Sequence, residues 1–426
     1  MEQQAYYAIG IFLVIYGLIV SEKIHRTVAA MIGGVVMIAG GIVDQETAIH
    51  HIDFNTLGLL IGMMIMVSVI SDTGLFRAIA VMAAKRAKGE PVRILISLAV
   101  LTAIASAFLD NVTTVLLMAP VTFGIARQLR VTPIPFIIAQ FMASNIGGTA
   151  TLIGDPPNIM IGSAEKSLTF MSFIWNLAPI AGIVLLAYLP IYVWLFRKQI
   201  RTTPELKAEL LRMDASGLIA DRRLLRQSLV ILSLTVAGFF LHQSLHLESA
   251  TVALAGAFLL LLLAGERRME EAFTRVEWAT IFFFVGLFVL VSGLVETGVI
   301  AELAAHAIEW TGGDLAATSM LILWLSAIAS AFLDNIPFVA TMIPLIQEMG
   351  RMGVNDLEPL WWSLALGACL GGNGTLIGAS ANLIAAGLSA KEGYPIRFLS
   401  YMKIGFPLML LSIALCSVYI YLRYLL

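Results

Sequence analysis

The stretch Ile104-Ala-Ser-Ala-Phe-Leu-Asp-Asn111 occurs twice in this chain and decides its fold. It returns letter for letter as Ile328-Ala-Ser-Ala-Phe-Leu-Asp-Asn335, an offset of 224 residues. The same offset aligns Gly147-Gly-Thr-Ala-Thr-Leu-Ile-Gly154 with Gly371-Gly-Asn-Gly-Thr-Leu-Ile-Gly378, and no gap is needed from about residue 27 to about residue 163. Two copies of one unit therefore make up almost the whole chain, and each copy carries a polar, glycine-rich pair of motifs.

The composition is that of a membrane protein. The chain is 59% hydrophobic and 13% charged, whereas an average soluble chain has about 25% charged residues. Many apolar runs reach roughly 20 residues, the length that crosses a hydrocarbon core of about 30 Å. We therefore predict an all-α polytopic membrane protein. The first run, at 6–20, lacks a basic leader and a small-residue cleavage site, so we expect it to be a retained helix.

The composition also argues against several partners and cofactors. A net charge of −2 and the absence of a basic tail give no indication of nucleic-acid binding. Cys369 and Cys416 both lie in apolar runs, with neither a disulfide framework nor metal-ligand spacing. No nucleotide-binding loop is present, so the energy source is an ion gradient or a separate ATPase. We expect no enzyme activity, no cofactor and no bound metal.

Each copy is expected to contain five crossings, one re-entrant hairpin and one broken helix. Asp110 and Asn111 stand at the midpoint of an apolar segment, and backbone leaves helical geometry at membrane depth only where it is buried in protein or lines a cavity. Glycines and two prolines interrupt the next segment, which therefore cannot be one straight helix. The elements predicted for the first copy are helices at 6–20, 27–43, 56–71 and 172–196, an amphipathic stretch at 76–88 that continues the third helix, the hairpin at 92–128 and the broken helix at 133–163.

Because five is an odd number of crossings, the second copy must insert upside down. We predict repeat 1 at 1–196, a linker at 197–224, and repeat 2 at 225–426 with its hairpin at 316–350 and its broken helix at 357–387. With the N-terminus outside, all of the 26 Lys and Arg residues except Lys166, Arg351 and Arg423 fall on the cytoplasmic side, together with the linker. The positive-inside rule favours this orientation in the cell (inner) membrane. Inverted repeats with interrupted helices are typical of secondary transporters, whose site lies near the midplane.

The hairpin tips carry the residues least expected in a membrane. An ionisable side chain at membrane depth costs about 2.5–3.5 kcal/mol, and Asp110 and Asp334 occupy equivalent tips. We interpret both as proton or cation sites, since burial favours the neutral form of a carboxyl group. The alternative is that each Asp caps the helix that follows it. Beside them, Asn111 and Asn335 offer both a donor and an acceptor to a polar substrate or a cation.

The interrupted helices supply the second set of candidates. Their paired glycines are expected to unwind the backbone, whose free carbonyls can ligate cations, while half-helix N-termini favour polar or anionic oxygens. Asp155 precedes two prolines and is either an N-cap or a coupling carboxylate. The candidate substrate- and ion-binding residues are Asp110, Asn111, Thr113, Asn145, Gly147, Gly148, Thr149, Asp155, Asn158, Asp334, Asn335, Gly371, Gly372, Asn373, Thr375 and Asn382, with Asp110, Asp334 and Asp155 as proton-coupling groups.

The chain resembles the arsenical pump (ArsB/NhaD-type) permeases of the ion transporter superfamily, close to the branch that includes the melanosomal P protein. The resemblance covers essentially the full chain and rests on Ala107-Phe-Leu-Asp-Asn-Val-Thr-Thr-Val-Leu-Leu-Met-Ala-Pro120 and Ala143-Ser-Asn-Ile-Gly-Gly-Thr-Ala-Thr-Leu-Ile-Gly-Asp-Pro-Pro-Asn158. It implies elevator-like movement of a transport domain against a scaffold. Related divalent-anion/sodium symporters carry Ser-Asn-Thr at their tips. Here the tips read Asp-Asn-Val-Thr and Asp-Asn-Ile-Pro, which suits a proton or a cation better than an anion.

The main functional prediction is proton-coupled export of arsenite or antimonite by elevator-type alternating access. Arsenite is a small neutral trihydroxide at neutral pH, which amides, hydroxyls and unwound backbone can bind while the hairpin carboxyls exchange protons. The alternative is a sodium/proton antiporter, or an organic-anion transporter, on the same fold. A channel is a different class, which nothing in the sequence demands. The predicted partners are arsenite or antimonite, protons or sodium, and membrane lipid; a homodimer and a separate ATPase subunit remain open.

Overall fold

The computed structural model describes residues 2–21, 23–212 and 216–426, and within these ranges the chain forms helices and turns without a β-strand. The helices of the first copy are α1 (Glu2–Ser21), α2 (Arg26–Ala39), α3 (Gln45–His50), α4 (Phe54–Ser71), α5 (Leu75–Arg86), α6 (Pro91–Phe108), α7 (Asn111–Gln128), α8 (Ile134–Gly148), α9 (Pro156–Ala164) and α10 (Phe170–Phe196). The linker contains α11 (Pro204–Arg212) and a short turn, η1 (Ser216–Leu218). The second copy comprises α12 (Arg222–Leu241), α13 (Ser249–Ala264), α14 (Glu266–Arg275), α15 (Trp278–Glu296), α16 (Val299–Thr311), α17 (Leu315–Phe332), α18 (Asn335–Arg351), α19 (Glu358–Gly371), α20 (Ser380–Lys391), α21 (Phe398–Ile420) and a final π-helical turn, η2 (Tyr421–Leu425).

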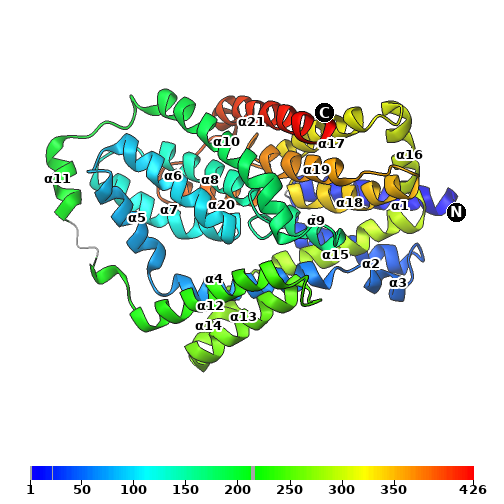
Figure 1. Cartoon of the computed structure of the whole chain (residues 1–426), viewed down its shortest axis with the longest axis horizontal. Coiled ribbons are helices and arrows are strands. Elements are labelled where there is room, and N and C mark those ends of the chain that lie inside the picture. The colour runs from blue at the N-terminus through cyan, green and yellow to red at the C-terminus, as the bar shows by residue number, and fades with distance from the viewer. Residues whose placement is uncertain (1, 22, 213–215) are drawn as a thin grey trace.

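The second copy repeats the first element by element, but in the opposite direction. α6 and α17 begin and end 224 residues apart, and α7 and α18 both begin directly after an Asp. The N-terminus lies at one end of the molecule and α11 at the other, and the matching helices α5 and α16 also lie toward opposite ends (Figure 1). The predicted all-α fold of two inverted repeats, each with a hairpin and a broken helix, is confirmed.

Eight of the described helices are long and apolar enough to cross a membrane: α1, α4, α6, α10, α12, α15, α17 and α21. α2 and α13, also predicted as crossings, have 14 and 16 residues, fewer than the ~20 that span a bilayer. The prediction of a helix at 27–43 was too long, because α2 ends at Ala39 before two glycines. The second of them, Gly41, has a φ of +68°, a conformation that favours glycine and ends the helix.

The third predicted helix does not continue into the amphipathic stretch. α4 ends at Ser71, and the chain turns at Gly74, whose φ of +78° places it in the left-handed region, before α5 begins. The separate helix α5 packs against α6 and α7 of the first hairpin, as its copy α16 packs against α17 and α18 of the second. α5 and α16 therefore each connect a membrane-crossing helix to a hairpin.

The helices divide into two groups (Figure 1). α1–α4 pack with α12–α15, where α2 runs along α15 and α4 along α13; we call this group the scaffold. α6–α10 pack with α17–α21, where α6 lies on α8 and α17 on α19; we call this group the hairpin body. The two groups meet where α7, α9 and α18 face α4 and α15. The hairpin tips lie at this interface.

Candidate functional site

Both hairpins turn at a Leu-Asp pair in extended conformation. Asp110 accepts hydrogen bonds from the backbone N–H of Thr113, at 2.9 Å, and from the Thr113 hydroxyl. Asp334 accepts one from the backbone N–H of Ile336, at 3.4 Å. The predicted capping role is therefore present at both tips, and both oxygens of each carboxylate accept hydrogen bonds within the protein.

Asp155 is not a helix cap. It begins α9 in an extended conformation, but its side chain makes no capping hydrogen bond. Its Oδ1 faces the Asn335 amide of the second hairpin at 3.5 Å, and its Oδ2 is buried with no hydrogen-bond partner among the described residues. Ser380, which could have capped the matching half-helix α20, also makes no cap and lies instead 3.3 Å from Asp334. Of the two roles considered for Asp155, side-chain capping is therefore absent from this structure.

Asparagines close the breaks of both interrupted helices. The Nδ2 atom of Asn158 donates to the carbonyls of Thr149, at 3.1 Å, and Thr151, at 2.8 Å. Asn382, its match in the second copy, donates to the carbonyls of Gly372, at 2.8 Å, and Thr375, at 3.0 Å. These unwound carbonyls, expected to be free cation ligands, are therefore bonded within the protein.

Each break is also joined to the other copy. Asn145 Nδ2 donates to the Oδ1 atoms of Asn382, at 3.0 Å, and Asn373, at 2.9 Å. At the equivalent position, Cys369 Sγ lies 3.5 Å from Asn158 Oδ1. Asn111 Nδ2 reaches Asn145 Oδ1 at 3.2 Å and so ties the first hairpin to this network. Four of the amides predicted as separate ligands are thus one buried, hydrogen-bonded cluster of Asn111, Asn145, Asn373 and Asn382.

The first glycine of each pair is still helical, and the breaks begin only after Gly148 and Gly371. α8 continues through Gly148, so Gly147 is still helical. A Cβ atom on Gly147 would lie 2.0 Å from the Ala103 carbonyl oxygen, and one on Gly371 would lie 2.5 Å from that of Ala327. These two glycines therefore allow α8 and α19 to approach the hairpin helices α6 and α17 closely.

The hydroxyls of the threonines predicted as ligands likewise donate hydrogen bonds within the protein, mostly to backbone carbonyls. Thr149 donates to the Asn145 carbonyl at 2.7 Å, Thr375 to that of Ala331 at 2.5 Å, and Thr151 to that of Ala107. Thr113 donates to Asp110. None of these hydroxyls is directed at a ligand, so they support the site and do not line it.

A small central cavity, of about 30 Å³, remains between the two groups of helices. The hairpin body contributes polar groups to its wall from both hairpins and both breaks, and the scaffold contributes further side chains from α2, α4 and α15. Of the predicted site residues, the cavity is lined by Asp110, Asn111, Asp155 and Asn335. Its other lining residues are Arg26, Leu60, Met64, Val112, Pro156, Glu277, Thr280, Ile336 and Ser380.

Arg26 is the principal correction to the sequence-based site. The sequence predicts it to be one of the cytoplasmic basic residues, but its guanidinium pairs with Asp334 and donates to the Ser380 hydroxyl at 2.8 Å. It also lies 5.1 Å from the centre of the Phe283 ring, a cation–π contact. Arg26 belongs to the scaffold and Asp334 to the hairpin body, so this ion pair crosses the interface between them.

Glu277 was missed, although the repeat offset could have found it. It precedes α15 as Asp53 precedes α4, and both acidic residues accept a hydrogen bond from the hydroxyl of the threonine three residues later. With Asp110, Asp155 and Asp334, Glu277 gives the centre four carboxyl groups against one guanidinium. Such an excess of negative charge, in which Asp155 is fully buried, favours bound protons or cations.

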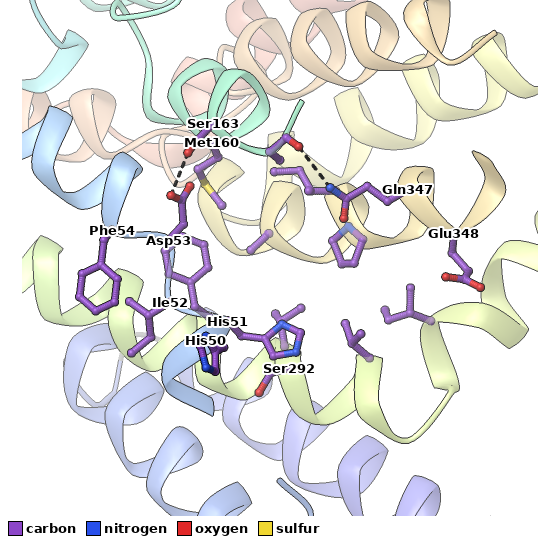
Figure 2. Close-up of a pocket in the computed structure, with 18 of the residues that line it drawn as sticks. His50, His51, Ile52, Asp53, Phe54, Met160, Ser163, Ser292, Gln347 and Glu348 are labelled. Carbon is purple, nitrogen blue, oxygen red and sulfur yellow. Dashed lines mark hydrogen bonds between the residues drawn. The ribbon is translucent and has the colours of Figure 1, made fainter. Parts of the chain in front are cut away.

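A larger cavity, of about 670 Å³, opens between the scaffold and the hairpin body on another side of the interface. Figure 2 shows Asp53, at the start of α4, bonded to Ser163 of α9, and Gln347 of α18 across the opening. His51, in the same wall, pairs with Glu296 at 2.9 Å. In the described part of the chain no group of three or more acidic, His or Cys side chains could hold a metal ion.

A third cavity, of about 270 Å³, reaches the second hairpin tip and is lined by Tyr16, His25, Arg26, Asp334 and Ser380, among others. Arg26 and Ser380 line both this cavity and the central one.

Inverted repeats whose hairpin tips and helix breaks meet at a buried polar cavity define a secondary membrane transporter. Residues 16–367 match the family described as citrate transporters (CitMHS), and the chain belongs to that family.

Individual relatives support this assignment. The chain is 42% identical over 423 residues to an uncharacterized transporter of Mycobacterium tuberculosis, covering 98% of each chain. It is 36% identical to the P protein of Mus musculus, covering 99% of this chain and 60% of that protein. The solved structure of the YdaH transporter of Alcanivorax borkumensis matches 98% of each chain with a TM-score of 0.62 and 14% identity, and so supports the fold. The predicted relationship to the P protein is confirmed.

Proposed function

We propose that this chain is a proton-coupled transporter in which Asp155 carries the coupling proton. The observation that supports this most directly is the buried Oδ2 atom of Asp155, which lacks a hydrogen-bond partner among the described residues. A buried carboxylate oxygen without a partner is strongly unfavourable when charged, and a bound proton removes that charge. Asp110 and Asp334 are engaged as caps, and Asp334 also pairs with Arg26, so they contribute as secondary proton sites.

In the proposed cycle the hairpin body moves against the scaffold, and the contacts between them break and re-form. The pair of Arg26 with Asp334 and the bond of Ser163 to Asp53, at 2.8 Å, both cross this interface. The guanidinium stabilises the present arrangement while Asp334 is ionised. A proton or a cargo cation on Asp334 weakens that contact, and the hairpin body is then free to move. Occupancy of the site is thereby coupled to movement through a difference in affinity between two states.

For the cargo we propose arsenite or antimonite, exported in exchange for protons. The central cavity of about 30 Å³ holds about one or two waters, so a small solute requires the least opening. Its excess of carboxyl groups disfavours an anion, whereas a neutral trihydroxide meets no charge repulsion. The amides of Asn111 and Asn335 supply donors and acceptors for hydroxyl groups.

Sodium/proton antiport is the second candidate, and the carboxyl excess around the cavity favours it. Hard cations prefer oxygen ligands, and Asp110, Asp155 and Glu277 could supply them. Citrate, the substrate that the family description names, would meet these same carboxyl groups. Its transport would therefore need protons or a cation bound together with it.

The test is a flux measurement on purified protein in liposomes with an internal pH dye and an imposed proton gradient. Arsenite, antimonite, sodium and citrate are added separately to the wild type, to Asp155→Asn and to Asp44→Asn, a control carboxylate that only caps the exposed helix α3. We expect proton flux evoked by arsenite or antimonite, lost in Asp155→Asn and retained in Asp44→Asn. Flux evoked by sodium alone would select the second candidate, flux evoked by citrate alone would refute the neutral cargo, and silence with all four would refute proton coupling.

A further inference from the structure

A continuous groove runs along α12, at the edge of the scaffold. One cavity, of about 520 Å³, follows a single face of the helix from Arg222 to Leu234. A second cavity, of about 410 Å³, lies between α12, α5 and α6. Ser233 lines both cavities. Because the shared residue joins them, one elongated ligand can occupy both.

We propose that this groove binds an anionic phospholipid, with its phosphate on Arg222 and Arg226 and one acyl chain in the second cavity. The two arginines are four residues apart, and side chains at this spacing are neighbours on one helix face. Both are exposed. Guanidinium groups form strong, charge-assisted hydrogen bonds with phosphate oxygens, so the pair provides a head-group site at the start of the membrane-crossing helix.

Beyond the arginines the groove is apolar. Leu229, Val230 and Leu234 expose 40%, 52% and 60% of their surface on this face. In the second cavity every lining residue except Ser233 is apolar, including Phe76 of α5 and Phe108 of α6. Exposed apolar surface that continues into an apolar cavity fits a hydrocarbon chain and no polar ligand.

The length of the groove also fits a lipid. From Arg222 to Val236 the helix rises by about 21 Å at about 1.5 Å per residue. One leaflet of a bilayer contributes about half of a hydrocarbon core of ~30 Å. A head group on the arginines therefore places the end of an acyl chain near the bilayer midplane, at the depth of the hairpin tips.

The second cavity lies between the scaffold and the hairpin body. Ile70 of α4 and Val236 of α12 belong to the scaffold, whereas Leu101 of α6 belongs to the hairpin body, and Leu109 directly precedes Asp110. An acyl chain in this position contacts both sides of the moving interface. The bound lipid would therefore influence transport without entering the central cavity.

The test is lipid retention, measured by native mass spectrometry on the full-length protein after reconstitution in phosphatidylcholine vesicles that contain phosphatidylglycerol. We expect the wild type to retain phosphatidylglycerol, and Arg222→Gln with Arg226→Gln to weaken its binding roughly 30-fold, from about 1 kcal/mol for each arginine near the membrane surface. Arg223→Gln removes an equal charge one residue away but outside the groove, and is expected to bind like the wild type.

Two further measurements distinguish a lipid site from binding of the phosphate group alone. Ser233→Trp fills the junction between the cavities, so it should reduce phosphatidylglycerol retention although both arginines remain. Soluble glycerol phosphate should not compete, because it lacks the acyl chain. Equal retention of phosphatidylcholine and phosphatidylglycerol by the wild type, or an equal loss in Arg223→Gln, would overturn the proposal.

Discussion

The two hairpin tips share eight identical residues and yet have different surroundings. Asp334 is paired with Arg26 of the scaffold and with Ser380. Asp110 is bonded to Thr113, and the residue that matches Arg26 in the second copy is Ala250. Thr113 in turn matches Pro337, which has no hydroxyl. The repeat thus reproduces the backbone of the tip, while the charge around it is set by residues outside the repeated motif.

This difference has a mechanistic meaning. In a molecule with identical halves, both tips would compete equally for a proton or cation. Here one tip is neutralised by a fixed cation of the scaffold, and the remaining carboxyls at the centre have none. The asymmetry makes one arrangement of the hairpin body electrostatically different from the arrangement related to it by the repeat.

The largest expected effect comes from Asp155, whose match in the second copy is Ala379. Exchanging the two residues, as Asp155→Ala with Ala379→Asp, moves the carboxyl to the other break. We expect proton flux in the liposome assay to fall to the level of empty liposomes, because the moved carboxyl enters a different set of amides. Full activity in the exchanged variant would show that it does not matter which of the two breaks carries the carboxyl group.

The next effect concerns the ion pair at the second tip. Arg26→Gln leaves Asp334 largely buried without its partner and is expected to cost about 3 kcal/mol of stability, as broken buried pairs do. Thermal unfolding in detergent measures this loss. The double variant Arg26→Gln with Asp334→Asn should recover most of it, since neither charge remains. If the double variant is no more stable than the single one, the pair is not the source of the effect.

A smaller effect is expected where the hairpins pack on the broken helices. Gly147→Ala places a methyl group 2.0 Å from the Ala103 carbonyl oxygen, and Gly371→Ala places one 2.5 Å from that of Ala327. We expect a cost of about 2 kcal/mol for each, with the first hairpin affected more, because overpacking forces backbone shifts. Gly124→Ala in α7 meets open space and serves as the control, with unfolding midpoints compared in the same detergent. A loss in the control equal to that in Gly147→Ala would contradict the packing explanation.

The smallest effect tests the threonine hydroxyl bond to the tip carboxylate, which only the first tip possesses. Thr113→Val removes the hydroxyl that donates to Asp110, and the expected cost is about 1 kcal/mol, the typical value of one hydrogen bond. Thr341→Val in the second hairpin removes a hydroxyl that bonds only to its own helix, at 2.7 Å, and should have less effect. Equal unfolding midpoints for the two variants would mean that the tip cap adds no stability of its own.

Much of the fold was predictable, because repetition and hydrophobic length are properties of the sequence itself. The constant offset between Asp110 and Asp334 predicted the two copies, and the charged residues within apolar runs predicted the hairpins. Helix ends were less accurate: the helix that begins at Arg26 stops four residues before the predicted end, because Gly40 and Gly41 follow it. Local backbone freedom decided that boundary, and apolar length alone cannot indicate it.

The site was only partly predictable. Asp110, Asn111, Asp155 and Asn335 line the central cavity as expected, but Asn158 and Asn382 bond to carbonyls that we had expected to be free. The contact of Arg26 with Asp334 joins residues 308 positions apart, and no pattern along the chain indicates it. It depends on how two groups of helices meet, which is a property of the assembled molecule.

The crossed bonds between the copies have a consequence for biosynthesis. Asn158 Oδ1 takes its hydrogen bond from Cys369, 211 residues later, and Asn145 donates to Asn382, 237 residues later. Each break is closed within its own copy but also receives hydrogen bonds from the other copy, so the first break lacks these partners until the ribosome has made the second copy. Two half-chains expressed as separate polypeptides should therefore fold only when they are expressed together.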